Sequence, residues 1–264
     1  LCNVPINTID GIKRAMKLPN AEIEYMGLNH FAFITKIEQD GKDYLQEALN
    51  AGLNSESMKN IPSSGFTKEQ IAAIGAIPTS YLEYYYFKDS KLDHLKHAEK
   101  SRGERCMEIE EELLAIYQNA ELHVKPAQLS QRGGARYSEV AINLVNSIWN
   151  DVGDIQVVNV LNKGAMDFLD DNDAVEVCAR IGKNGATPLK VTGVVNDHLK
   201  EYIRQVKAYE KHAVKAALEG SKIEAMRALV MNPLCGDLKT ASACFDELLE
   251  AHKEFLPQFN KNEQ

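Results

Sequence analysis

The pattern of apolar and polar positions along the chain predicts a fold built mainly of helices. Apolar residues recur every three to four positions with charged residues between them, which is the period of a half-buried helix. The clearest stripe lies opposite a row of glutamates and consists of Cys106, Ile109, Leu113 and Ile116. By the same pattern, and by start and stop signals, helices are expected at residues 9–17, 42–53, 68–76, 105–117, 138–149, 196–220, 223–231 and 238–255.

Two regions have the pattern of β-strands instead. Residues 23–37 alternate as one strand or a broken pair, which places His30 at a strand end or a bulge. Residues 154–191 contain β-branched runs separated by turn sequences, at 155–160, 174–181 and 189–191. The sequence therefore predicts an α+β fold, a helix-rich domain with a small, mostly antiparallel sheet. No repeat or linker interrupts the chain, so residues 1–264 are expected to form one domain.

Composition and charge argue against several classes of partner. A formal net charge of -8 disfavours nucleic acid, because a duplex ligand needs a dense positive face. No apolar run approaches the roughly 20 residues of a membrane span, so no membrane partner is expected. Five cysteines at irregular spacing argue against a disulfide framework and suit a reducing compartment. A cytoplasmic location is therefore expected.

Candidate metal chemistry lies near the start of the chain. Cys2 opens the segment Cys-Asn-Val-Pro-Ile-Asn, and His30 lies in a polar break between apolar stretches. A thiolate and an imidazole can share a divalent ion and leave coordination positions open for substrate oxygens. Spacing alone leaves the alternatives of a buried thiol and a core histidine, because a Cys and a His this far apart are not a dedicated metal motif.

Four segments together resemble a known family. They are Leu-Cys-Asn-Val-Pro-Ile-Asn at 1–7, Gly-Leu-Asn-His-Phe at 27–31, Ile-Pro-Thr-Ser-Tyr-Leu-Glu-Tyr-Tyr-Tyr at 77–86 and Arg-Gly-Gly-Ala-Arg-Tyr-Ser-Glu at 132–139. In this order and at similar spacing they resemble signatures of the family 4 glycoside hydrolases, the NAD- and manganese-dependent 6-phosphoglycosidases. The last segment is similar to the 6-phospho-β-glucosidase branch. The resemblance runs from residue 2 to about residue 259.

The resemblance also implies what this chain lacks. The family begins with a dinucleotide-binding domain that carries a Gly-x-Gly-x-x-Gly turn, and no such turn occurs here. The chain is therefore expected to be the C-terminal catalytic, substrate- and metal-binding domain, without the N-terminal NAD-binding domain. Its fold should resemble the C-terminal domain of lactate/malate dehydrogenase-like enzymes and of family 4 glycosidases.

Site residues are carried over by matching motifs. The resemblance implies Cys2 and His30 as metal ligands and Tyr81 as the general base, whose phenol needs a nearby cation to lower its pKa. Arg102 matches an active-site arginine with a one-residue difference in spacing, so Arg105 remains an alternative. For these roles Tyr81 has to lie within about 10 Å of the metal ligands.

Two asparagines complete the expected site. Asn3 stands where α-specific members carry an acidic Asp, so the resemblance implies the β-specific branch, with Asn3 binding substrate. Asn29, beside His30, is a candidate hydrogen-bonding partner for sugar hydroxyls, with a purely structural role in its loop as the alternative.

The implied activity is hydrolysis of 6-phospho-β-glucosides. It proceeds by NAD-dependent oxidation at C3, removal of the C2 proton by Tyr81 and elimination, rather than by a pair of carboxylates. The implied cofactors are NAD, bound mainly by the absent N-terminal domain, and Mn²⁺ or another divalent metal. The metal's identity is not determined by the donors, because a thiolate prefers zinc or copper. The expected partners are a phosphorylated disaccharide or aryl glucoside and further copies of the chain, in a dimer or tetramer.

Two other hypotheses remain open at this point. The chain could be an isolated, non-catalytic substrate and oligomerisation domain, since it has no recognisable nicotinamide site. It could also be the substrate domain of a lactate- or malate-dehydrogenase-like enzyme, in which a catalytic His with an Asp partner would be expected instead of a metal-binding Cys.

Overall fold

A computed structural model describes residues 4–53, 65–132, 136–235 and 237–262. Contacts divide the chain into two compact units, Leu1–Val194 and Val195–Gln264. The first unit contains the whole sheet, and the second contains only helices. That these two units form the single expected domain stays a prediction.

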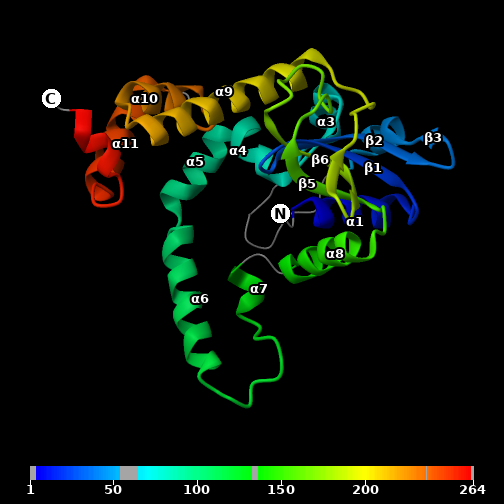
Figure 1. The fold of residues 1–264 in the computed structure, drawn as a ribbon, viewed down its shortest axis with the longest axis horizontal. Helices are drawn as coiled ribbons and strands as arrows, with labels where there is room; N and C mark the ends of the chain where they lie inside the picture. The colour runs from blue at the N-terminus through cyan, green and yellow to red at the C-terminus, as the bar shows by residue number, and fades with distance from the viewer. Residues whose placement is uncertain (1–3, 54–64, 133–135, 236, 263–264) are drawn as a thin grey trace. The chain divides into compact units, whose positions relative to one another are not determined.

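The first unit is organised around an antiparallel sheet (Figure 1). Its strand order is β3-β2-β1-β6-β5, with β4 paired to β2 and β7 paired to β6. The strands are β1 (Glu22–Leu28), β2 (Phe31–Gln39), β3 (Lys42–Asp43), β4 (Ile77–Pro78), β5 (Ile155–Leu161), β6 (Ala174–Gly182) and β7 (Gly185–Pro188). Pairing of β1 with β6 joins the two strand regions of the sequence into one sheet, so segments about 150 residues apart lie side by side.

The strand predictions are mostly confirmed. Residues 23–37 form a broken pair, the β1–β2 hairpin, and the runs at 155–160 and 174–181 are β5 and β6. The predicted strand at 189–191 is wrong. The chain returns along β6 four residues earlier, as β7, because Gly185 has a φ of 98° and allows a tight turn after Gly182.

Nine short and long helical segments of the described chain accompany this sheet. They are α1 (Val4–Met16), α2 (Leu45–Ala51), α3 (Lys68–Ile74), the 3₁₀ turn η1 (Ser80–Leu82), α4 (Glu83–Tyr86), α5 (Lys88–His97), α6 (Arg102–Tyr117), α7 (Leu129–Arg132) and α8 (Tyr137–Asn150). Helix α6 begins three residues before the predicted start because Ser101 and Glu104 form a capping box. The predicted helix at 42–53 begins as strand β3, and only its second part is helical.

The second unit consists of α9 (Asp197–Glu219), α10 (Lys222–Met231), α11 (Leu238–Ala251) and η2 (Pro257–Asn262). Helix α9 begins at the N-cap Asn196 and ends at Gly220, whose φ is 67°. A Cβ on Gly220 would lie 2.0 Å from the carbonyl oxygen of Gln258, so glycine also permits the approach of the last segment. The helix predicted to reach residue 255 ends at Ala251.

The core of the first unit lies in the β1–β2 hairpin and the elements packed on it. Side chains of both strands are almost completely inaccessible; they include Tyr25, Met26, Leu28, Phe33, Ile34 and Ile37. Consecutive buried residues mean that this part of the sheet is covered on both faces. The hairpin is therefore a rigid base for the turn at its end.

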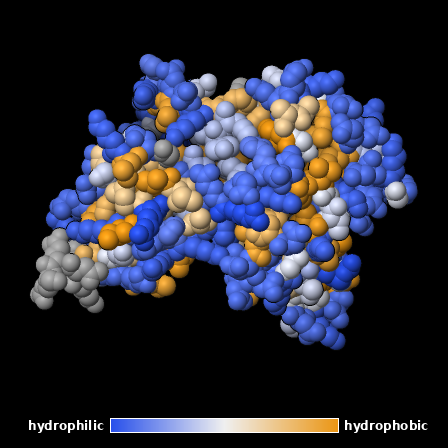
Figure 2. Space-filling model, turned by 90° about the horizontal axis from the view of Figure 1, so that it is seen from above, coloured by the Kyte–Doolittle hydropathy of each residue, from blue (hydrophilic) through white to orange (hydrophobic). Residues whose placement is uncertain are grey.

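Apolar side chains also remain at the surface. Figure 2 shows orange apolar patches among the mostly hydrophilic surface of one face. On α8, Val140 is buried, whereas Ile142, Val145 and Trp149 are exposed, the last to 85%. The predicted amphipathic helix thus leaves much of its apolar stripe in contact with solvent.

No helix in the described ranges has the length and apolar character that crossing a membrane requires.

A buried carboxylate in the second unit gives a pH-dependent stability. Hydrogen bonds from His212, Lys215 and Arg227 to Glu224 hold the pKa of its carboxyl at about 2, below the usual 4.5. A depressed pKa in the folded state stabilises the fold above about pH 4.5, and this stabilisation is lost as the pH falls towards 2. We expect Glu224→Gln to lower the free energy of unfolding at neutral pH. The difference in this free energy between variant and wild type should shrink as the pH falls from about 4.5 towards 2.

Urea denaturation at several pH values measures this difference. The control is Glu250→Gln on α11, which removes an exposed ion pair with Lys253 that contributes little. A Glu224→Gln difference that stays constant down to pH 2 would contradict the assignment.

Candidate active site

The predicted metal ligand His30 lies in the two-residue turn of the β1–β2 hairpin. Leu28 pairs with Phe31, and the two residues between them have positive φ angles, 41° at Asn29 and 77° at His30. Such a turn matches the twist of the flanking strands, and Asn and His are among the few non-glycine residues that adopt this backbone readily. Asn29 is exposed in this turn and His30 is half-buried.

Two side chains from other strands hold the backbone of His30. Its N–H donates to Oε2 of Glu176 on β6 at 3.1 Å, and its carbonyl accepts from Oγ1 of Thr79 at 2.6 Å. The backbone N–H of Thr79 also donates to the carbonyl of Ala32 at 2.9 Å. The turn is therefore attached both to the centre of the sheet and to the segment that leads into η1.

Tyr81, the predicted base, lies directly beside this turn. It belongs to η1, two residues after Thr79, and its ring stacks on the His30 ring with centroids 4.8 Å apart and an interplanar angle of 23°. Tyr81 is thus within the expected distance of His30, whereas its distance from Cys2 stays a prediction because Cys2 lies outside the described residues. Tyr81, Tyr84 and Tyr85 do not share one helix, since η1 ends at Leu82 and α4 begins at Glu83. The Tyr84 ring lies beside the ammonium group of Lys91, and the Tyr85 ring packs edge-to-face against Tyr86.

The electrostatic setting of His30 suits a metal ligand. Burial lowers the pKa of its imidazole below 6.5, while the negative charge of Glu176 acts in the opposite direction. A neutral imidazole at pH 7 has a ring nitrogen lone pair to offer. Within the described ranges no group of three or more His, Cys, Asp or Glu side chains could hold an ion. His30 by itself suits a metal ligand. Its predicted partner Cys2 lies outside the described residues, and so does Asn3.

The arginines occupy a different environment. Arg102 is exposed at the first residue of α6, and its Nη2 donates to the carbonyls of Gln131 and Arg132 at 2.8 and 2.9 Å. Arg105 contacts Gln131 and Glu108. These contacts connect α6 with α7, and no described contact links either arginine to His30 or Tyr81. An active-site role for Arg102 remains a prediction.

Sequence reasoning did not identify Glu176 and Thr79. The sequence contained a signal for Glu176, because it is a lone acidic residue inside the β-branched run of β6. The structure shows that its side chain is completely buried, which is rare for a glutamate. Thr79 lies in the segment 77–86 that resembles a family signature. Its hydrogen bond to His30 joins residues 49 positions apart, and no local sequence pattern predicts it.

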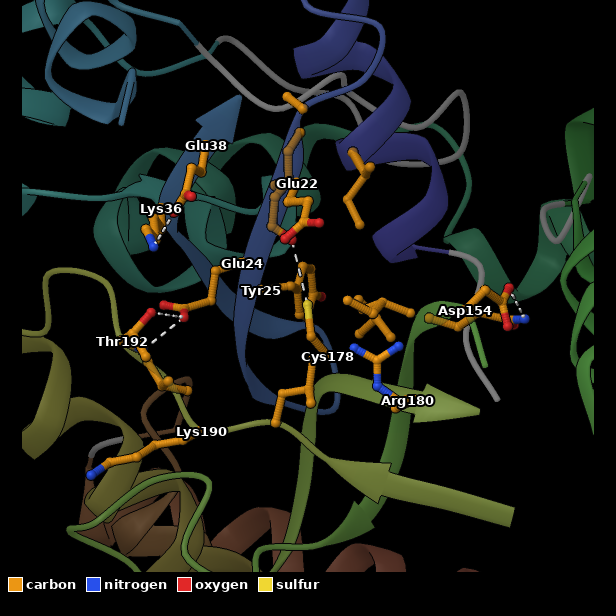
Figure 3. Close-up of a pocket in the computed structure, with 18 of the residues that line it drawn as sticks. Glu22, Glu24, Tyr25, Lys36, Glu38, Asp154, Cys178, Arg180, Lys190 and Thr192 are labelled. Atoms are coloured by element: carbon orange, nitrogen blue, oxygen red, sulfur yellow. Dashed lines mark hydrogen bonds and ion pairs between the residues drawn. The ribbon is translucent and has the colours of Figure 1, made fainter. Parts of the chain in front are cut away.

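A cleft of about 570 Å³ lies at the other end of β1 (Figure 3). Glu22, Glu24, Lys36 and Arg180 are among the charged residues that line it, whereas His30 and Tyr81 do not. Glu24 accepts hydrogen bonds from the backbone and hydroxyl of Thr192 at 2.7 and 3.1 Å, so its carboxylate holds the 189–192 segment in place. This cleft is separate from the candidate active site.

Comparison with known proteins identifies the family of the chain. The model described as the family 4 glycosyl hydrolase C-terminal domain matches residues 25–235. The chain belongs to the family 4 glycosyl hydrolases. This confirms the resemblance found in the sequence and decides against a lactate- or malate-dehydrogenase-like enzyme.

Several family 4 relatives are named as β-specific enzymes. The probable 6-phospho-β-glucosidase of Bacillus subtilis (strain 168) is 38% identical over 267 residues, covering 98% of this chain and 60% of the relative. The 6-phospho-β-glucosidase of Escherichia coli (strain K12) is 33% identical over 270 residues, covering 98% and 60%. The chain thus spans about 60% of the length of these relatives.

Solved family 4 structures confirm the fold. The 6-phospho-β-glucosidase of Thermotoga maritima with manganese, NAD⁺ and glucose-6-phosphate has a TM-score of 0.82 and 30% identity, covering 97% of this chain and 60% of that one. A 6-phospho-α-glucosidase from gut microorganisms has a TM-score of 0.75 at 22% identity, covering 98% and 62%, and shows the fold alone. The predicted helix-rich α+β fold with a small antiparallel sheet is therefore confirmed.

The stacked pair should be measurable as a coupling energy. We expect a double-mutant cycle of His30→Ala and Tyr81→Ala to give about 0.5–1.5 kcal/mol, because stacked rings contribute beyond their buried area. The measurement is the free energy of unfolding of the two single variants and the double variant. A matched cycle of His30→Ala with Tyr85→Ala should be additive to within about 0.5 kcal/mol. Equal coupling in both cycles would contradict the stacking.

Proposed function

We propose that this chain is the C-terminal substrate- and metal-binding domain of an enzyme that hydrolyses 6-phospho-β-glucosides. The observation that carries the proposal is the contact between His30 and Tyr81, which brings the expected metal ligand and the expected base together. Supporting it are the family 4 relatives named as 6-phospho-β-glucosidases. Asn3 adds support for the β-specific branch, because an amide cannot act as the acid that an Asp would provide there.

In this proposal each residue has one task. His30 and Cys2 hold a divalent ion, Tyr81 accepts the proton from C2 of the sugar, and Asn3, Asn29 and Arg102 bind substrate. Ring centroids 4.8 Å apart support this assignment, because groups that act on one sugar have to lie close together. The positive charge of a divalent ion at His30 would also favour the phenolate form of Tyr81, which a general base requires.

The cofactors complete the chemistry. A divalent ion at His30 would polarise a sugar carbonyl as a Lewis acid, and NAD would accept and return the hydride at C3. The Thermotoga maritima structure with manganese, NAD⁺ and glucose-6-phosphate supports both cofactors and a phosphorylated substrate. We assign NAD mainly to an N-terminal domain outside this chain, and the ion to Mn²⁺ or another divalent metal.

The same proposal covers the setting of the enzyme. We assign it to the cytoplasm, where phosphorylated disaccharides or aryl glucosides would be its substrates, and to a homo-oligomer, a dimer or a tetramer. Neither nucleic acid nor membrane is a partner in this proposal. Light scattering of the purified protein tests the oligomer directly.

An alternative is that the chain on its own is a non-catalytic substrate and oligomerisation domain. The observation favouring it is that the chain spans only about 60% of its relatives, and its sequence has no dinucleotide-binding glycine turn. The two proposals differ in whether joining the chain to an upstream NAD-binding domain produces turnover.

The test is the release of p-nitrophenol from p-nitrophenyl-β-glucoside 6-phosphate with NAD⁺, Mn²⁺ and a reductant. We expect turnover by the chain joined to its upstream domain and none by the 264-residue chain alone. In the longer protein, Tyr81→Phe should lower kcat by about 10²–10⁴-fold, because the ring stack is kept and only the proton acceptor is lost.

The control is Tyr84→Phe, which removes a hydroxyl from the same segment and should leave kcat close to that of the wild type. Turnover of Tyr81→Phe equal to that of Tyr84→Phe would overturn the role of Tyr81. Absence of turnover in the longer protein, with metal and NAD bound, would remove the 6-phospho-β-glucosidase assignment.

A further inference from the structure

Glu176 is a carboxylate at the centre of the sheet, and its side chain is completely buried. On β6 it pairs directly with Gly27 of β1, and directly paired residues place their side chains on the same face. Gly27 in turn pairs with Ala32, so on the β1–β2 side of Glu176 the row contains only small residues, whereas Asn159 of β5 pairs with Glu176 on the other side. This leaves room for the Glu176 side chain to extend over β1 towards the turn at its end.

The close packing of this row requires glycine at position 27. A Cβ there would lie 2.3 Å from the Cβ of Ala32 and 2.5 Å from backbone atoms of the hairpin. The strands approach this closely only because the side chain is missing. Glycine at position 27 is thus required by the close approach of β1 and β2 beside Glu176.

One oxygen of Glu176 receives both of its hydrogen bonds. Oε2 accepts from the Tyr25 hydroxyl and from the His30 N–H, each at 3.1 Å. Oε1 is buried and makes no hydrogen bond with any described residue. Burying a carboxylate with one oxygen unsatisfied costs free energy, and a buried apolar side chain would avoid this cost. Stability of the sheet therefore does not explain the residue.

Its contact with the turn does explain it. Glu176 accepts from the backbone N–H of His30 and Thr79 donates to its carbonyl, so the backbone of His30 is held on both sides while His30 keeps its positive φ. Thr79 also leads into the turn that carries Tyr81. Holding the backbone of His30 thus determines where its ring lies relative to the Tyr81 ring.

We propose that Glu176 is a positioning residue that holds the His30 turn and thereby places the imidazole for ligand binding against Tyr81. The metal-binding part rests on the proposed function, whereas the placement of the ring does not. Glu176 touches neither substrate nor metal in this proposal and acts only through His30. The interaction that matters is the acceptor atom Oε2, so an amide oxygen at the same place should replace it.

The first measurement is NMR of the 264-residue chain with its seven histidines labelled with ¹³C. A ring stacked at 4.8 Å shifts the His30 ring protons upfield; His30→Gln assigns the signal, and Tyr81→Leu gives its unstacked position. We expect Glu176→Ala to move the His30 signal most of the way to that position. Glu176→Gln should keep it near the wild-type value, because both hydrogen bonds end on one oxygen.

Matched variants separate positioning from a general loss of stability. Glu224→Gln alters a different buried glutamate, which lies in the second unit, whereas Glu176 lies in the first. This variant should not move the His30 signal. Should Glu176→Ala fail to fold, Glu176→Asp replaces it, because the shorter side chain keeps the charge but withdraws the acceptor. A His30 signal that does not move in the folded Ala or Asp variant, or that moves equally in Gln, would overturn the proposal.

The second measurement is the dissociation constant for Mn²⁺, followed by the electron paramagnetic resonance of the free ion. We expect Glu176→Ala to weaken binding by about 10–100-fold, as is usual for residues that orient a metal ligand. Glu176→Gln should bind close to the wild type, and equal affinity of all three proteins would overturn the positioning role. A wild-type chain that binds no Mn²⁺ but shows the expected NMR shifts would contradict the proposed function and leave the positioning of His30 intact.

Discussion

The hydrogen bond from the His30 backbone to Glu176 is the interaction on which the candidate site depends. It attaches a two-residue turn to a strand that follows about 150 positions later in the chain. The turn residues have positive φ angles, which Asn and His adopt more readily than most side chains, and the hydrogen bonds to Glu176 and Thr79 hold His30 in this conformation. Thr79 donates to the carbonyl of the same residue and leads into the turn of Tyr81, so the backbone of His30 connects both expected functional side chains.

This arrangement places a local cost inside a stable framework. Buried apolar residues on both faces of the β1–β2 hairpin make it rigid, whereas a buried carboxylate with an unsatisfied oxygen and positive φ angles disfavour the fold at the same place. Costs of this kind concentrate at functional sites, because a ligand needs groups placed in advance of binding. The rigid hairpin is the part of this domain that we expect to position His30, the proposed metal ligand.

Local patterns predicted most of the elements, because helix periodicity and caps act over a few residues. Helix α9 begins at Asn196 and ends at Gly220 as its signals indicate, and the hairpin at 23–37 follows from alternation. The sequence was less informative where tertiary contacts compete with propensity. Residues 80–86, whose tyrosines have helical spacing, divide into a 3₁₀ turn and a short helix. The helix expected to reach residue 255 ends at Ala251. Family motifs placed His30 and Tyr81 in one site, and the structure brings their rings together.

The sequence by itself determined the fold class through its periodicity, and the resemblance of its short motifs to family 4 indicated the family and the candidate metal ligand and base. Only the tertiary structure decided which residues support them. Glu176 and Thr79 lie 146 and 49 positions from His30, and their roles arise from strand pairing rather than from neighbouring residues. A buried side chain acts through its partners across the sheet, and a single sequence does not record which distant strand supplies them.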